Sequence, residues 1–245
     1  MNIHDIQAVQ ILPGTESCCL MDQEIRGTRV NYCSLKPEES ICFAECSGFS
    51  RILIILSGTG AALQQGRTFC LHMRDVLVQQ PQSPLTIRPG SAMGLIELQR
   101  SLTENEFLEL SRSKQLPYYV EYDLAPTYRE DCKSEKTVSR MLIPARVVPN
   151  FALGSVQTAG VDRVEKHSHP MLEQYFFGMA DNNCVAMIDD VEFPFGPNTL
   201  LHIPLGSDHG IRSAENQTVH YYWMDFLFGE EGLTYMDTAH TMNEN

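Results

Sequence analysis

Two short segments of the sequence carry residues that could bind a metal ion. Residues 167–173 contain two histidines and a glutamate, and a second segment ends at His209. Side chains at positions i and i+2 of an extended segment lie on the same face, so His167 and His169 can reach one point. Glu173 and His209 can join them if the fold brings the segments together. Three imidazoles and a carboxylate suit Fe(II), Mn(II), Zn(II) or Ni(II), whereas Ca(II) and Mg(II) prefer oxygen ligands.

The charge of the chain excludes some other functions. Its 245 residues carry a formal net charge of −13, and Lys and Arg form no cluster that could neutralise phosphates. We therefore expect no binding to nucleic acid or to an anionic membrane surface. The sequence has neither a bilayer-spanning apolar run nor an N-terminal export signal, which favours a cytoplasmic protein with a small-molecule ligand. The eight cysteines lack paired spacings and are expected to be free thiols.

The elements that must position these residues are predicted to be strands. Short apolar runs alternate with turns rich in Gly, Pro, Asn and Asp, as where residues 51–56 end at Ser57-Gly58-Thr59-Gly60. This pattern is typical of an all-β sandwich or barrel.

The second half of the chain repeats the strand order of the first half at an offset of about 120 residues. Residues 173–178 parallel residues 53–58, and residues 198–204 parallel residues 75–81. A helix is predicted between the halves, because Thr103 and Glu106 form a capping-box pattern, and a polar connector follows it. The sequence therefore predicts a first domain over residues 1–100, a helical and charged linker over 101–136, and a second domain over 137–245.

The spacing of the motif residues resembles the two conserved motifs of the cupin superfamily. Those residues are Gly160-x6-His167-x-His169-x3-Glu173-x4-Gly178 and Gly196-x7-Pro204-x-Gly206-x2-His209. The resemblance covers most of residues 150–227 by motif, and residues 30–100 only by strand order and turn glycines. One extra residue before His167, a shorter Glu173–Gly178 interval and the lack of an Asn after His209 depart from the usual motif.

The resemblance implies a bicupin, with two tandem jelly-roll barrels joined by a short helical linker. Because proteins with barrels of this kind dimerise, the resemblance also implies a homodimer. At the positions that correspond to the four ligands, the first half has Ser47, Phe49, Leu53 and Thr86, which cannot hold a transition metal well. We therefore expect one divalent transition metal per chain (Fe, Mn, Zn or Ni) in the second barrel. The first barrel is expected to be metal-free and closed by apolar side chains.

Alternation along the strands predicts which other residues face the metal. If His167 and His169 face inward, so do Arg163 and Glu165. These two could pair with each other. Alternatively, Arg163 could bind a substrate carboxylate while Glu165 moves a proton. Tyr175, a second candidate base, would share the face of Glu173.

Other lining residues follow from the same alternation. Phe177 would face the cavity with Tyr175. On the last strand, the inward set is either Tyr221, Trp223 and Asp225, which we favour because it brings a large aromatic ring and a carboxylate to the metal, or His220, Tyr222 and Met224. His202 could touch the cavity beside the ligands or be an ordinary core histidine.

Three histidines and a glutamate would leave two open positions on an octahedral ion, for a substrate oxygen or for dioxygen. We therefore predict a metal-dependent enzyme that acts on a small polar organic acid or a sugar-derived substrate. The pattern does not distinguish an isomerase, a lyase, a hydrolase and a dioxygenase. The alternative is a non-catalytic, metal-containing protein that binds or senses a small molecule.

Overall fold

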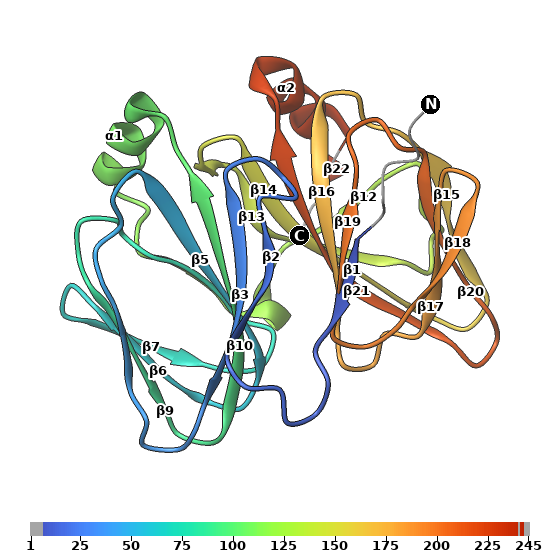
Figure 1. Ribbon diagram of the computed structural model, residues 1–245. Coiled ribbons are helices and arrows are strands. Elements are labelled where there is room, and N and C mark those ends of the chain that lie inside the picture. Colours follow the sequence, from blue (N-terminus) through green and yellow to red (C-terminus); the bar gives the residue numbers. More distant parts are fainter. Residues whose placement is uncertain (1–6, 240, 243–245) are drawn as a thin grey trace. The chain divides into compact units, whose positions relative to one another are not determined.

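Strands are the main secondary structure in both halves of the chain in the computed structural model, which describes residues 7–239, 241 and 242 (Figure 1). The chain divides into two compact units. We call them the N-terminal barrel, formed by Pro13–Ala125 and Val147–Pro149, and the C-terminal barrel, formed by the described residues up to Leu12, Pro126–Arg146 and the described residues from Asn150 on. No helix among the described residues is long and apolar enough to cross a membrane.

The N-terminal barrel consists of two antiparallel sheets. Its six-stranded sheet has the order β11 (Tyr118–Val120), β8 (Val76–Val78), β5 (Phe49–Ser57), β10 (Met93–Ser101), β3 (Thr28–Leu35) and β2 (Cys18–Asp22). Its four-stranded sheet has the order β4 (Ile41–Phe43), β9 (Leu85–Pro89), β6 (Gly60–Gln64) and β7 (Arg67–Leu71). Alternate residues of β5 and β10, such as Leu53, Ile55 and Leu95, enter the core between the sheets. This arrangement confirms the all-β prediction.

The interior of the N-terminal barrel also contains a charged group, which the sequence did not predict. Arg51 donates from Nε to Glu97 Oε1 at 2.6 Å and from Nη1 to Gln79 Oε1 at 2.5 Å. The rings of Phe43 and Phe49 each lie 5.0 Å from its guanidinium carbon. Apolar side chains therefore do not close this barrel completely, as the sequence had suggested they would. The buried ion pair is tolerated because several acceptors satisfy the guanidinium.

The predicted helix is α1 (Glu104–Arg112), and its capping box is present. Thr103 Oγ1 accepts from the amide of Glu106, and Glu106 Oε2 accepts from the amide of Thr103. The 3₁₀ helix η1 (Tyr122–Leu124) follows β11. The predicted linker does not form a separate segment, because β11 pairs with β8 in the N-terminal barrel and β12 (Thr127–Arg129) pairs with β13 (Val138–Val148).

The C-terminal barrel has the same two-sheet plan. Its eight-stranded sheet has the order β1 (Ala8–Gln10), β19 (Thr199–Ile203), β16 (Leu172–Gly178), β21 (Thr218–Leu227), β14 (Phe151–Ala159), β13, β12 and β22 (Thr241–Met242). Its four-stranded sheet has the order β15 (Asp162–His167), β20 (His209–Ser213), β17 (Cys184–Ile188) and β18 (Val191–Phe195). The helix α2 (Gly229–Ala239) follows β21.

The N-terminal strand β1 belongs to the C-terminal barrel. It pairs with β19, and the flanking Ile11 donates from its amide to Asn198 at 2.9 Å. The expected first domain of residues 1–100 therefore differs from the observed unit, which begins at Pro13. Strand pairing joins residues that are distant in sequence, so local patterns could not reveal this partner. The eight cysteines are free, as expected.

Candidate metal centre

Two paired strands and a loop bring three histidines together. His167 ends β15 and lies opposite His209, which begins β20, and their ring centroids are 4.7 Å apart. His169, in the loop after β15, lies with its ring centroid 4.8 Å from that of His167. One nitrogen from each ring lies within 4.8 Å of the others. Among the residues that the structure describes, this is the only group of three His, Cys, Asp or Glu side chains that could hold a metal ion.

A β-bulge in β15 turns His167 into the cavity. Val164 pairs with Ile211, but the next pair along these strands is His167 with His209, so β15 contains one extra residue. The alternation that predicted inward-facing Arg163 and Glu165 is therefore broken. Their side chains are 56% and 64% exposed and pair with each other at 3.0 Å. Neither lines the cavity, whereas the buried Val164 does.

Hydrogen bonds orient two of the imidazoles for metal binding. The Nδ1 atoms of His167 and His209 lie 2.7 Å and 3.1 Å from the backbone oxygens of Glu165 and Ser207. A carbonyl oxygen can only accept, so each Nδ1 carries the proton and the neutral ring keeps a lone pair on Nε2.

The environment of His209 also favours its metal-binding form. Burial and, to a smaller extent, the nearby His167 lower the pKa of His209 to about 4, which keeps its ring neutral at pH 7. His209 Nε2 is buried and has no hydrogen-bond partner among the described residues.

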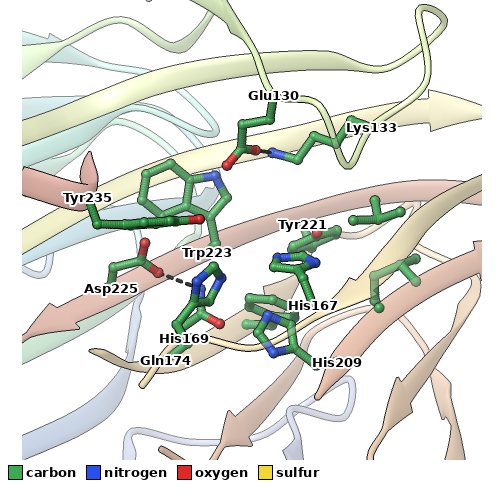
Figure 2. Close-up of a pocket in the computed structure, with 14 residues that line it drawn as sticks. Glu130, Lys133, His167, His169, Gln174, His209, Tyr221, Trp223, Asp225 and Tyr235 are labelled. Atoms are coloured by element: carbon green, nitrogen blue, oxygen red, sulfur yellow. Dashed lines mark hydrogen bonds and ion pairs between the residues drawn. The ribbon is translucent and has the colours of Figure 1, made fainter. Parts of the chain in front are cut away.

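Gln174, and not Glu173, faces the histidines. The two residues lie on opposite faces of β16, and Gln174 lines the cavity (Figure 2). Its Oε1 is buried without a hydrogen-bond partner, and its Nε2 donates to Asp225 Oδ1 at 2.7 Å. Glu173 instead lies with Oε1 3.1 Å from His202 Nε2. The prediction that Glu173 joins the three histidines thus differs from the structure by one position, because the loop between β15 and β16 sets which residue faces inward.

The same register decides the positions of the aromatic candidates. Tyr221, Trp223 and Asp225 line the cavity, which is the favoured set of β21. Tyr175 and Phe177 do not line it, and Phe176 does. Tyr175 is buried against Phe226, with ring centroids 5.4 Å apart. His202 is also absent from the cavity lining.

A buried carboxyl group stands beside Gln174. Burial raises the pKa of Asp225 to about 7, although the hydrogen bond from Gln174 acts in the opposite direction. A carboxyl with this pKa can hold or release a proton at neutral pH, which is the property of a general acid or base. Strand alternation predicts that Asp225 lines the cavity, but its proton affinity depends on burial that the sequence does not reveal.

The remaining polar wall comes from segments that the sequence did not single out. Glu130 and Lys133 follow β12, and Tyr235 lies on α2 with its ring centroid 4.9 Å from that of His169. Among the lining residues that the sequence analysis missed, only Gln174 could have been found from the sequence, because it lies one residue beyond Glu173 in the motif. Glu130, Lys133 and Tyr235 carry no local signal, because only the tertiary fold brings their segments to the cavity.

The donors fit a divalent transition metal. The imidazole nitrogens of His167, His169 and His209 are borderline ligands, and the amide oxygen of Gln174 is a hard one. His209 Nε2 and Gln174 Oε1 are both buried without a hydrogen-bond partner. A cation could supply that partner for both atoms.

Comparison with known proteins supports the fold. No family model matches the sequence, and no curated protein matches it either. Among solved structures, a cupin 2 conserved barrel domain protein from Leptotrichia buccalis is similar with a TM-score of 0.59 and 16% identity, covering 90% of this chain and 96% of its own. The oxalate decarboxylase formate complex from Lactobacillus farciminis has a TM-score of 0.65 and 12% identity, covering 90% and 84% of the two chains. The 7S globulin from Momordica charantia has a TM-score of 0.64 and 11% identity, covering 91% and 82%.

These similarities extend over most of each chain, at identities that report on the fold alone. They include an oxalate decarboxylase and a globulin, so the fold does not choose between an enzyme and another kind of protein. The two-sheet plan of each unit and these neighbours together confirm the fold that the motif spacing implied. The chain has the two-barrel cupin fold of the bicupins.

Proposed function

We propose that the C-terminal barrel binds one divalent transition metal (Fe, Mn, Zn or Ni) through His167, His169, His209 and Gln174. The observation that carries this proposal is the convergence of three imidazoles, one of which keeps a buried nitrogen without a hydrogen-bond partner. Leaving a buried polar atom unpaired costs about 1–3 kcal/mol. A bond to a metal ion would remove this cost.

We further propose that the protein is an enzyme that acts on a small polar organic acid or a sugar-derived substrate. All four proposed donors are neutral, so they leave the charge of a divalent ion uncompensated and favour an anionic ligand. When bound, the ion would supply Lewis-acid or redox chemistry to a substrate oxygen. Asp225 would transfer the proton, Gln174 would hold its carboxyl in place, and Trp223 and Tyr221 would exclude water.

Elemental analysis tests the metal site first. Protein prepared without chelator or nickel affinity resin should contain about one transition metal ion per chain, and His167→Ala should lose it. The matched control is Arg163→Gln, because Arg163 is close in sequence but exposed outside the cavity. Wild-type protein that binds none of Fe(II), Mn(II), Zn(II) and Ni(II) stoichiometrically would refute the site.

Turnover assays then distinguish an enzyme from a binding protein. Metal-loaded protein should convert a member of a panel of keto acids, ureido acids and sugars. If the panel contains ligands that raise the melting temperature but none that is converted, the protein is better described as a binding or sensing protein.

We also propose a homodimer, which light scattering of the purified chain would test.

A further inference from the structure

The cavity beside the histidines is too small for an organic substrate. Its volume is about 30 Å³, and a cavity needs about 10–15 Å³ by this measure to hold one water molecule. Sites for small organic ligands usually have volumes of about 300–1,000 Å³. A second cavity of about 350 Å³ lies in the same barrel. We call the two the inner and the outer cavity.

The two cavities have two lining residues in common, Glu130 and Lys133. The side chains of this pair therefore lie between the inner and the outer cavity. Figure 2 shows them facing each other on the side of the inner cavity away from Gln174 and His209.

Lys133 is held as a buried cation. Its Nζ contacts Glu130 Oε2 and donates to the hydroxyl of Tyr128 at 3.2 Å, and the Lys133 side chain is 8% exposed. Burial, the largest single influence, would lower the pKa of Lys133, but the charge and hydrogen bond of Glu130, with smaller contributions from Tyr221 and Cys132, together raise it. The Tyr128 hydroxyl also accepts from Trp223 Nε1 at 3.0 Å, which fixes its position. Lys133, which Tyr128 helps to hold in place, thus already binds a carboxylate.

The backbone that carries this pair is attached to the strand of the first histidine. Lys133 bridges to Val164 of β15, and the amide of Glu165 donates to the Cys132 oxygen at 2.9 Å. The amide of Lys133 donates to the Glu130 oxygen at 3.2 Å, which closes the turn. The long side chains can therefore exchange partners while their backbone keeps its position relative to His167.

We propose that Lys133 determines the specificity of the metal site by binding a carboxylate of the substrate in place of Glu130. In the absence of substrate, the Glu130 carboxylate occupies the place of the substrate carboxylate at Lys133. Its displacement opens the inner cavity to the outer one. This inference rests on the proposed metal function. A carboxylate ligand restores the charge-assisted contact that Lys133 loses, so the exchange costs little, whereas a neutral ligand cannot compete with Glu130.

The outer cavity indicates what the rest of the substrate is like. Its wall is polar, with hydroxyl groups and charges of both signs from Arg129, Asp131, Ser134, Glu135, Thr137 and Ser139. Such a surface suits hydroxyl or amino groups and offers little to a hydrocarbon chain. The substrate class is therefore a hydrophilic carboxylic acid with one end at the metal and its carboxylate at Lys133.

Full-length protein loaded with Co(II) provides the test. Malonate and succinate are titrated in turn, with malonamide and succinamide as uncharged controls, and binding is followed by calorimetry and by the visible absorption of Co(II). We expect at least one dicarboxylate to bind and its diamide not to bind. Glu130→Gln should bind the dicarboxylate several-fold more tightly, because it removes the competing carboxylate.

The decisive variant is the double substitution Lys133→Gln with Glu130→Gln, which leaves no unpaired buried charge. It should keep its Co(II) and bind the dicarboxylate at least about tenfold more weakly than wild type. The control is the exposed pair changed in the same way, Arg163→Gln with Glu165→Gln, which should bind like wild type. The role of Lys133 would be overturned if the Co(II)-loaded double variant bound the dicarboxylate as tightly as wild type. It would also be overturned if Co(II)-loaded wild type bound no dicarboxylate. Failure of wild type to hold Co(II) would instead overturn the metal site, and this inference with it.

Discussion

Gln174 and Glu173 are chain neighbours whose side chains lie on opposite faces of β16. Glu173 is the better metal ligand by charge, but it pairs with His202 away from the cavity. Gln174 is the weaker donor by charge, but its oxygen is buried beside the histidines. Position therefore outweighs intrinsic donor strength at this site.

Substitution of these two residues tests whether Gln174 or Glu173 is the metal ligand. Gln174→Ala should weaken metal binding by at least about tenfold, in the range found when residues that support a metal are removed. Glu173→Ala should leave metal affinity nearly unchanged and lower the free energy of unfolding by about 1 kcal/mol, because His202 loses its partner. Competition titrations against a chelator measure the first effect, and urea unfolding measures the second. Equal losses of metal affinity in both variants would contradict the assignment.

The buried carboxyl of Asp225 predicts a pH dependence of stability in the metal-free protein. Its pKa is about 7 in the folded protein against 3.8 as the ordinary value, so the folded state binds the proton more tightly. This preference stabilises the fold at pH values below about 4 and is lost as pH rises to about 7. Asp225→Asn has no charge to bury and keeps an acceptor for Gln174.

Asp225→Asn should therefore gain stability relative to wild type by roughly 2–3 kcal/mol between pH 5 and pH 8, since one pH unit corresponds to about 1.4 kcal/mol. Urea unfolding of both proteins after chelator treatment measures this difference. A stability difference that is the same at pH 5 and pH 8 would show that Asp225 titrates with its ordinary pKa.

At the scale of the elements, the contact between β15 and β20 sets the distance between His167 and His209. Gly210 follows His209 directly, and a Cβ atom there would lie 2.7 Å from the backbone oxygen of Val164. A backbone atom within a strand cannot move away without shifting the pairing. The glycine therefore allows the bulged strand and β20 to approach closely beside the metal site.

Gly210→Ala should accordingly lower both metal affinity and stability, the latter by about 1–3 kcal/mol as for other overpacked sites. Gly196→Ala is the control, because its nearest neighbour would be Gln10 Nε2 at 3.8 Å, an ordinary contact. Chelator competition and thermal unfolding measure the two effects. Unchanged metal affinity in Gly210→Ala would show that the close strand contact does not position His209.

At the scale of the whole molecule, the two barrels use corresponding positions for different purposes. Leu53 lies opposite Glu97 in the pair β5–β10, as Gln174 lies opposite Asp225 in the pair β16–β21. Glu97 is paired with Arg51, so this carboxylate is neutralised within the N-terminal barrel. The expectation of one metal per chain rests separately on Ser47, Phe49, Leu53 and Thr86, which stand at the positions that correspond to the predicted ligands.

Arg51→Gln should therefore lower the free energy of unfolding by about 3–5 kcal/mol, because Glu97 keeps a buried charge without its partner. Metal content should stay at the wild-type value in this variant, and also in Ser47→Ala and Thr86→Ala. Elemental analysis and urea unfolding of the full chain measure these outcomes. Loss of metal in Ser47→Ala or Thr86→Ala would contradict the correspondence between the two halves.

Local signals in the sequence predicted the elements and the histidines of the site. Apolar alternation and turn residues are local signals, so they predicted the strands, the helix α1 with its capping box, and the duplication. The spacing of His167, His169 and His209 predicted that they would meet, because the residue types and the cupin motif are both readable from the chain.

The neighbours of these histidines were set by tertiary packing and could not be predicted locally. A single extra residue in β15 reversed the faces of Arg163 and Glu165, and the loop before β16 exchanged Glu173 for Gln174. A shift of one residue inverts every side chain of a strand, and the apolar pattern of β16, which is mostly buried on both faces, does not fix it. Lys133 and the strand β1 reach the C-terminal barrel through contacts between residues distant in sequence, which are settled only when the chain packs.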